Sequence, residues 1–401
     1  EALRVQDAGA DAYNVAIGQA AGAAVTTGLY NVLIGGLAGD AITDGEKNVA
    51  IGHEALTTDT GDGHNVAIGY RALKTLDTAA AGYNTAIGFD TGLNMTTGIF
   101  NTLIGANAGD TLTTGDRNVA VGYLALTTED AGDRNVAIGT EALKSQDGAN
   151  YNVAIGDSAA ENLTTGSESV FIGGLAGDAI TTGSANVAVG YSALTSEVAY
   201  GNNTAVGYKA LQDLDAGANG NNVAVGAEAG RRLSTGTENT VVGAAAGDHL
   251  TTGGYNVAIG YQALTTEDVY GRNVAIGANA LRDLDAGADA YNIAIGYEAG
   301  KVVSTGVENV LIGGNAGDAL TIGKHNVAIG HDSLSAANAG DFSVAIGHSA
   351  LREQSGAAPG DNFYNVAVGY QAGKVVTTGI NNILVGGFAG EALTAGAGNT
   401  V

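Results

Sequence analysis

A five-residue motif recurs along the whole chain at nearly constant spacing, and this regularity constrains the fold more than any other feature. The motif most often reads Asn-Val-Ala-Ile-Gly, first at Asn14 and last at Asn399. Its 23 starts are separated by eighteen intervals of 17 residues, three of 19 and one of 22. Such a period is typical of solenoids, in which each unit packs on its neighbours. We therefore expect a single continuous array over residues 1–401, with about 23 coils.

Both ends of the sequence fall inside a repeat. The first three residues, Glu1-Ala2-Leu3, match the middle of a later copy at Glu141-Ala142-Leu143, and the last motif stops after Val401. We therefore expect the chain to be a fragment of a longer one.

The motif has the composition of a short β-strand followed by a corner. Its second and fourth residues, such as Val15 and Ile17, are β-branched and lie on one strand face. Its fifth residue is Gly in all 22 complete copies, which predicts a corner where only Gly has the needed φ/ψ, or where a neighbouring backbone comes close. Seventeen extended residues span at most ~56 Å, the perimeter of one coil, with neighbouring coils ~4.8 Å apart. The predicted fold is all-β, a parallel β-solenoid, in which the recurrent Asn could form an amide ladder.

A longer period is superimposed on the first. The residue that follows the recurring Ala alternates two by two, beginning Gly22, Gly39, Leu56, Leu73. Four coils therefore form a super-repeat, and each longer interval follows a fourth coil. We expect these longer turns to project on one side. They occupy residues 73–84, 211–222, 281–292 and 351–365, the last with the only proline, Pro359.

The third residue of the motif is apolar in every complete copy, so the strand carries apolar residues on both faces. Such a strand is typically buried on both faces. We expect the β-branched pair to fill the coil and the third residues to pack in a homo-oligomer, most simply a cyclic trimer. The bulky third residues occur in second coils, where a small residue follows the motif, which suggests volume compensation. The predicted interface includes Ala16, Leu33, Ala50, Ala67, Leu103, Phe171, Val241, Leu311 and Leu384.

Charge and composition exclude several classes of function. The 16 basic and 41 acidic residues give a net charge of -25, which disfavours nucleic acid and anionic membrane surfaces as partners. No apolar stretch is long enough to span a bilayer, and the chain has no cysteine. The uniform repeat leaves no room for a catalytic cleft, so we predict neither an enzyme nor a cofactor.

The extended motif Asn-Val-Ala-Ile-Gly-x-x-Ala, as in residues 14–21 and 65–72, resembles the head repeat of YadA-like trimeric autotransporter adhesins. The variant Asn-Val-Ala-Ile-Gly-Tyr-x-Ala-Leu-Thr-Thr at residues 256–266 is also similar to repeats of bacteriophage tail-fibre and appendage proteins. The adhesin resemblance implies a left-handed β-roll with three chains to a head. The longer coil and the super-repeat depart from the adhesin pattern and favour a phage-like fibre.

Two sets of polar residues are candidate cation ligands. His331 and His348 occupy one position in successive coils and should stack, although exposed residues without a metal are the interpretation we favour. An acidic column has one member per super-repeat. Its members lie too far apart within one chain to share an ion, and only symmetry copies could bring them together, so we favour turn-capping acids and predict no metal. These candidates are Asp40, Asp110, Asp178, Asp248 and Asp318.

Tyrosines that follow the motif glycine are candidate glycan contacts, because an exposed Tyr has an apolar face and a polar tip. The interpretation that we favour is that they cover small neighbouring Ala and Gly residues. They are Tyr70, Tyr123, Tyr191, Tyr208, Tyr261, Tyr297 and Tyr370.

Together these features predict an extracellular structural or adhesive fibre segment, as a virion appendage or on a cell surface. The leading hypothesis is the shaft of a phage tail fibre, a rigid spacer for host attachment. The alternative is the head of a bacterial surface adhesin that binds host or matrix ligands. Partners would be further copies of the chain and a host-surface glycan or protein.

Overall fold

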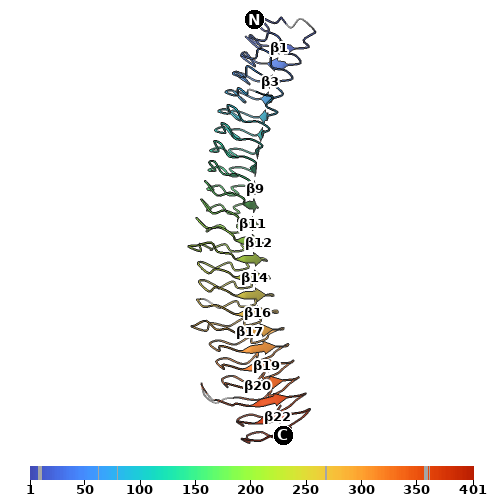
Figure 1. Cartoon of the computed structure of the whole chain (residues 1–401), viewed down its shortest axis with the longest axis vertical. Coiled ribbons are helices and arrows are strands. Elements are labelled where there is room, and N and C mark those ends of the chain that lie inside the picture. Colours follow the sequence, from blue (N-terminus) through green and yellow to red (C-terminus); the bar gives the residue numbers. More distant parts are fainter. Residues whose placement is uncertain (8–10, 62, 79, 267–268, 356–359, 361) are drawn as a thin grey trace. The chain divides into compact units, whose positions relative to one another are not determined.

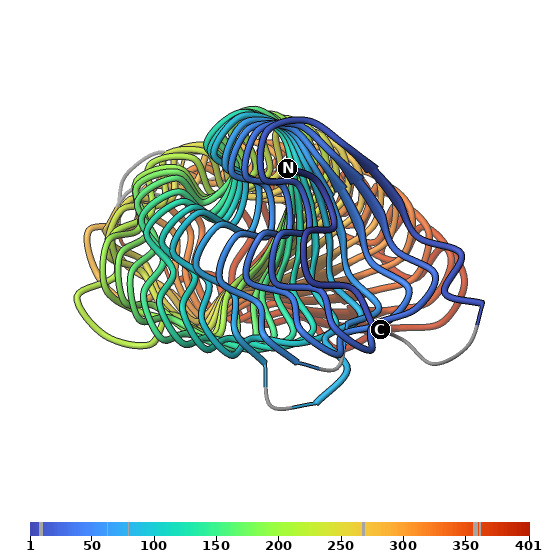
Figure 2. The same ribbon diagram turned by 90° about the horizontal axis from the view of Figure 1, so that it is seen from above.

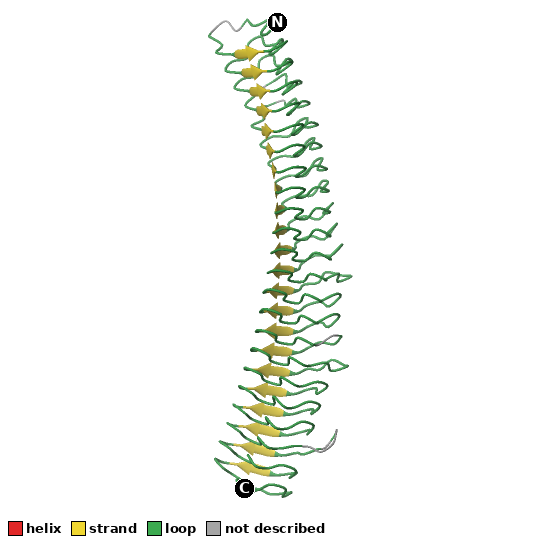
Figure 3. Cartoon of the chain, turned by 180° about the vertical axis from the view of Figure 1, so that it is seen from behind, coloured by secondary structure: helices red, strands yellow, loops and turns green. Residues whose placement is uncertain are grey.

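The computed structural model describes residues 1–7, 11–61, 63–78, 80–266, 269–355, 360 and 362–401. These residues form two compact units, Glu1–Gly201 (unit 1) and Asn202–Val401 (unit 2). The described residues contain 22 strands of three residues each and no helix (Figure 3). Each unit is a β-solenoid made of the same 17-residue coil. The single uninterrupted array expected over residues 1–401 stays a prediction.

Each strand occupies the second to fourth residues of one motif copy, so the β-branched pair and the residue between them form the strand, as predicted. In unit 1 the strands are β1 (Val15–Ile17), β2 (Val32–Ile34), β3 (Val49–Ile51), β4 (Val66–Ile68), β5 (Thr85–Ile87), β6 (Thr102–Ile104), β7 (Val119–Val121), β8 (Val136–Ile138), β9 (Val153–Ile155), β10 (Val170–Ile172) and β11 (Val187–Val189). In unit 2 they are β12 (Thr204–Val206), β13 (Val223–Val225), β14 (Thr240–Val242), β15 (Val257–Ile259), β16 (Val274–Ile276), β17 (Ile293–Ile295), β18 (Val310–Ile312), β19 (Val327–Ile329), β20 (Val344–Ile346), β21 (Val366–Val368) and β22 (Ile383–Val385).

Within each unit every strand pairs in parallel with the strand of the next coil (Figure 1). The register follows the motif even across longer turns, since Val66 pairs with Thr85 and Val344 with Val366. Extra residues are therefore absorbed outside the sheet. In unit 2 the longer turns of residues 211–222 (yellow-green) and 281–292 (orange) project on the same side of the coil (Figure 2), as expected. Pro359 lies outside the described residues.

The coil is closed by corners with left-handed backbone. At the motif glycine, Gly35 has φ +138°, and a Cβ built there would lie 2.3 Å from the carbonyl oxygen of Gly52 in the next coil. Only Gly fits where backbones of successive coils come this close. The predicted requirement for Gly at the fifth position is thus confirmed, and both the positive φ and the close approach between coils contribute to it.

The recurrent Asn forms the predicted ladder inside each unit. In unit 1, Asn118 is buried, and its Oδ1 accepts a hydrogen bond from the backbone N–H of Asn135 at 2.8 Å. Its Nδ2 donates to the carbonyl oxygen of Gly132 at 2.8 Å. Each amide therefore joins its own coil to the next one through buried backbone groups. Where the motif begins with Ser169, the hydroxyl oxygen accepts from Asn186 N–H at 3.1 Å.

The core of each coil is thin and is filled by the middle residue of the strand. Ala50 at this position and Ala55 on the facing segment are both fully buried. In second coils the middle residue is bulky, and the core makes room because Gly occupies the position after the recurring Ala. A Cβ at Gly39 would lie 2.8 Å from Leu33 Cδ2. In third and fourth coils that position holds a buried Leu, such as Leu56. The four-coil super-repeat is therefore a pattern of core packing.

This arrangement corrects the predicted oligomer interface, because its residues point into the coil. The narrow coil accepts a small residue, or a large one opposite Gly, whereas two β-branched side chains would overfill it. The β-branched pair consequently faces outward, the reverse of the prediction. The residue that compensates for the bulky third residue was also wrongly predicted. It is the glycine after the recurring Ala, such as Gly39 opposite Leu33, and not the small residue after the motif, such as Gly36. Leu33, Ala50, Ala67, Leu103, Phe171, Val241, Leu311 and Leu384 are 0–1% exposed, and Ala16 of the first coil is half-buried.

Candidate functional site

The outward face of the sheet is the most distinctive surface of each unit. It consists of the first and third residues of every strand, which we call the outward strip. All of these residues are Val, Ile or Thr. Ile87, Ile104 and Ile138 are each 37% exposed, whereas the middle residues of the same strands are buried. The outward strip is thus an uncharged, largely apolar band on a chain of net charge -25.

One side of the outward strip is bordered by the residue that precedes each motif Asn, which we call the Asn-side column. Aromatic rings stack along it from coil to coil in unit 1. Tyr13 and Tyr30 have ring centroids 5.7 Å apart with an interplanar angle of 5°. Tyr83 stacks on Phe100 at 5.4 Å, and the Arg117 guanidinium lies 5.4 Å from the centroid of the Phe100 ring.

Unit 2 has the same feature in the same column. The Arg272 guanidinium lies within cation–π distance of Tyr255, at 5.2 Å, and of Tyr291, at 5.7 Å. Phe342 stacks between His325 at 4.7 Å and Tyr364 at 5.2 Å. This column was not predicted, although aromatic or basic residues recur before the motif Asn at a period of 17 residues.

The other side is bordered by the residue after each motif Gly, the Gly-side column, which contains the predicted glycan-contact tyrosines. Tyr70 stacks with His53 at 5.7 Å and with Phe89 at 5.3 Å, and Tyr370 stacks on His348 at 5.4 Å. Residues without a ring interrupt the column at irregular intervals, so the seven tyrosines do not form one uninterrupted row. Exposed fractions of 43–60% are found for Tyr70, Tyr123, Tyr191, Tyr208, Tyr261, Tyr297 and Tyr370.

The predicted acidic column lies at a corner of the coil, with one carboxylate in each super-repeat. Oδ1 of Asp40, Asp110, Asp178 and Asp318 is buried without a hydrogen-bond partner. Burial raises the pKa of each of these four carboxyls above 3.8. Oδ1 of Asp248 likewise has no hydrogen-bond partner, but Asp248 differs because its carboxylate forms an ion pair with Arg231, with 3.0 Å between Oδ1 and Nε. Successive members are separated by four coils within each unit, so they do not converge on one ion.

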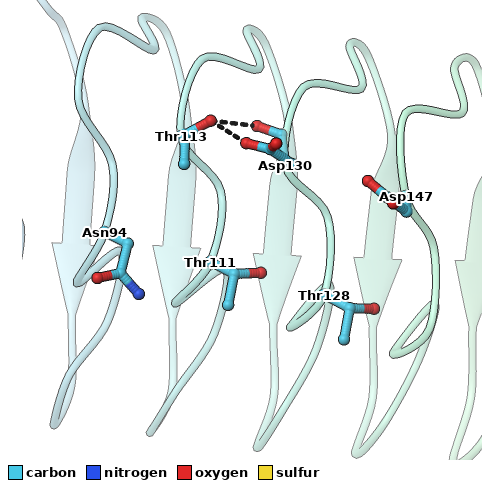
Figure 4. A pocket seen from close by; sticks show the side chains of 6 residues that line it. All are labelled: Asn94, Thr111, Thr113, Thr128, Asp130 and Asp147. Atoms are coloured by element: carbon cyan, nitrogen blue, oxygen red, sulfur yellow. Dashed lines mark hydrogen bonds between the residues drawn. The ribbon is translucent and has the colours of Figure 1, made fainter.

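A shallow groove of about 440 Å³ follows another face of unit 1. Asn94, Thr111 and Thr128 line one side, and Thr113, Asp130 and Asp147 line the other (Figure 4). The hydroxyls already serve the stacking of coils, since Thr111 donates to the carbonyl oxygen of Thr127 and Thr128 to that of Lys144. The groove therefore offers carboxylates to a ligand, but few hydrogen-bond donors that are not already used between coils.

The two predicted stacking histidines do stack. The rings of His331 and His348 have centroids 5.4 Å apart and an interplanar angle of 13°. Asp332 lies beside them, and these three residues form the one cluster, within the described part of the chain, with the residue types and spacing for a metal ion.

Comparison with known proteins does not assign the chain to a family. No protein-family model matches it, and no curated protein matches it significantly.

Within the described residues, the structure contains no helix that is long and apolar enough to cross a membrane.

Proposed function

We propose that the chain is a non-enzymatic structural segment of an extracellular fibre, in which copies of the chain associate along their outward strips. The supporting observation is the strip itself. In unit 1 and in unit 2 it carries two uncharged β-branched or threonine side chains per coil. Exposed apolar bands of this extent are typical of interaction surfaces rather than of monomer surfaces.

A second copy of the chain is the occupant that fits the strip best. The strip repeats once per coil, at about 4.8 Å. A partner must present apolar groups at the same interval to contact every coil, and a parallel, in-register copy does so. The outward residues of one unit, of which Ile87, Ile104 and Ile138 are each 37% exposed, together present on the order of 1,000 Å² of surface. Each partner contributes ~800 Å² to a standard interface.

Closed threefold association is the arrangement that we propose. Three strips that face a common axis bury one another, while the Asn-side and Gly-side columns of adjacent chains meet at the rim. Cationic and aromatic residues in these columns, such as Arg134 with Tyr151, could then contact the neighbouring chain. The resemblance to YadA-like heads supports three chains and left-handed winding. The interface of this trimer differs from that expected from the sequence, since β-branched residues replace the Ala ladders.

The biological setting that we propose is the shaft of a phage tail fibre or appendage. The structural support is the regular ladder of hydrogen-bonded coils in each unit, which suits a stiff spacer. The second candidate is a bacterial adhesin head, and the exposed Tyr residues favour it, because rings such as Tyr261 could contact host glycans. Purified chain that binds glycans or cells, and that loses this binding when these tyrosines are changed to Ala, would favour the adhesin.

Sedimentation equilibrium of the intact chain tests the association. A trimer has a mass of 118.5 kDa, three times the 39.5 kDa of the chain. Ile138→Lys should reduce the association because it places charge in the outward strip, whereas Asn94→Lys, in the exposed groove, should leave it unchanged. Circular dichroism checks that both variants fold. A folded 39.5 kDa monomer at micromolar concentration would overturn the proposal.

A further inference from the structure

The Gly-side column of unit 2 contains a cluster of metal-ligating groups between two consecutive coils. His331 follows β19 and His348 follows β20, so parallel pairing of these strands places the two imidazoles one above the other. Asp332 is the next residue along the first coil, at a corner with φ +56°. One potential ligand atom from each of the three residues lies within 4.8 Å of the others.

The distances between these ligand atoms are close to those between two ligands of one bound metal ion. Zn²⁺ binds imidazole nitrogen at 2.0–2.1 Å and carboxylate oxygen at a similar distance, so two ligands of one ion lie at most about 4 Å apart. His331 Nδ1 and Asp332 Oδ2 are already 3.2 Å apart. His331 is 57% exposed, so its ring is free to tilt by the remaining fraction of an ångström.

Neighbouring groups hold the ligands in place. Asn315 Nδ2 donates to Asp332 Oδ1 at 3.1 Å, which leaves Oδ2 directed at His331. Ser349 Oγ lies 3.0 Å from His348 Nδ1, and Tyr370 stacks on the far side of the His348 ring. Partners of this kind fix ring and carboxylate orientation at metal sites and strengthen binding.

The local charge also favours a cation. The chain has a net charge of -25. Burial is the main cause that raises the pKa of the nearby Asp318, and repulsion from the carboxylate of Asp332 adds to it. A divalent ion at the cluster would offset this repulsion.

We propose that His331, Asp332 and His348 form a binding site for a divalent transition-metal ion of the Zn²⁺ class, with water completing the coordination. Two imidazole nitrogens exclude Mg²⁺ and Ca²⁺, which prefer oxygen ligands, whereas Zn²⁺, Ni²⁺ and Cu²⁺ accept this set. The ion would clamp the coils of β19 and β20 together. This inference does not depend on the proposed fibre function.

Calorimetric titration of the whole chain with Zn²⁺, in excess Mg²⁺ to saturate surface carboxylates, tests the site. We expect one tight equivalent per chain. His331→Gln and His348→Gln should each weaken it at least tenfold, and Asp332→Asn about tenfold. His53→Gln is the matched control, because His53 occupies the same column in unit 1 and stacks on Tyr70 rather than on a second His. It should leave the affinity unchanged.

Electron paramagnetic resonance of the unmodified chain loaded with Cu²⁺ tests the ligands directly, because it does not depend on whether a variant folds. Two coordinated nitrogens per Cu²⁺ are expected from the paired imidazoles. Unaltered Zn²⁺ affinity in His331→Gln and His348→Gln, an equal loss in His53→Gln, or a Cu²⁺ spectrum without two coupled nitrogens would overturn the proposal.

Discussion

Gly39 lies against the isobutyl group of Leu33, so closely that a Cβ at Gly39 would be 2.8 Å from Leu33 Cδ2. The next coil has the opposite pair, with Ala50 in the strand and Leu56 at the position of the glycine, both fully buried. Large and small residues are therefore exchanged across one thin core. This exchange, repeated every four coils, is what the super-repeat represents in three dimensions.

The first prediction is that the two positions are strongly coupled. Leu33→Ala alone should lower the free energy of unfolding by about 2–5 kcal/mol through a cavity, and Gly39→Leu alone should overfill the core. The double variant reproduces the Ala50–Leu56 pair and should recover at least about 1 kcal/mol relative to the sum of the single changes. Urea unfolding of the four chains measures this coupling. Strict additivity would show that the two side chains do not share one space.

Much of the fold could be predicted because each repeat position is sampled more than twenty times. The strand at residues 15–17, the glycine corner at Gly18 and the ladder at Asn31 all follow from residue type and period. The direction in which the strand faces could not be predicted in the same way. Val, Ala and Ile are all apolar, and only the width of the closed coil decides that Ala points inward.

The roles of single turn residues that do not recur from one repeat to the next could not be predicted from the sequence either. Glu129 lies in an acidic turn, but its side chain is fully buried. Its Oε1 accepts hydrogen bonds from the N–H groups of Ala131 and Gly148, and Oε2 accepts from Gln146 Nε2 at 2.7 Å. Such a site depends on which backbone groups the turn happens to direct inward. Asp332, the third member of the cluster with His331 and His348, was missed for a related reason, since it joins the two histidines only through the corner geometry.

The second prediction concerns the glycine corner. Gly122→Ala should cost more than about 3 kcal/mol, because the new Cβ would lie 2.3 Å from the carbonyl oxygen of Gly139 and the coils would have to separate. Gly386→Ala is the control. Gly386 is also a motif glycine with nearly the same φ, +137° against +144° for Gly122, but the nearest atom to the added Cβ is Ala389 Cβ at 4.0 Å, so only backbone strain of about 1–3 kcal/mol is expected. Thermal unfolding compares the two, and equal costs would argue against close approach as the cause.

The third prediction is that Ser can partly replace Asn in the ladder. Asn118→Ala leaves the N–H of Asn135 and the carbonyl of Gly132 buried without partners, which should cost about 2–4 kcal/mol. Asn118→Ser should cost less, since the chain itself uses Ser169 as an acceptor for Asn186 N–H. Hydrogen exchange at the amide of residue 135 provides a local measurement. Faster exchange in the Ser variant than in the Ala variant would contradict this account.

The last prediction uses the acidic column. Burial raises the pKa of Asp178, and repulsion from Glu161 acts in the same direction, while backbone N–H groups oppose the shift. The folded chain therefore binds this proton more tightly than the unfolded chain. Ionisation lowers stability at neutral pH, and the loss disappears as the pH falls below the unfolded pKa of the carboxyl. Asp178→Asn should consequently raise the midpoint of unfolding at pH 7, and the gain should shrink towards pH 3.

Asp248 occupies the same position in a later super-repeat and gives the matched comparison. Its carboxylate pairs with Arg231, with 3.0 Å between Oδ1 and Nε, so Asp248→Asn removes an attraction instead of relieving a burial cost. We expect this variant to be less stable than the unmodified chain at pH 7, by about 0.5–1 kcal/mol. If Asp178→Asn raises stability and Asp248→Asn lowers it, the ion pair with Arg231 accounts for the difference between the two positions. Stabilisation by both variants would mean that the ion pair does not compensate for burial.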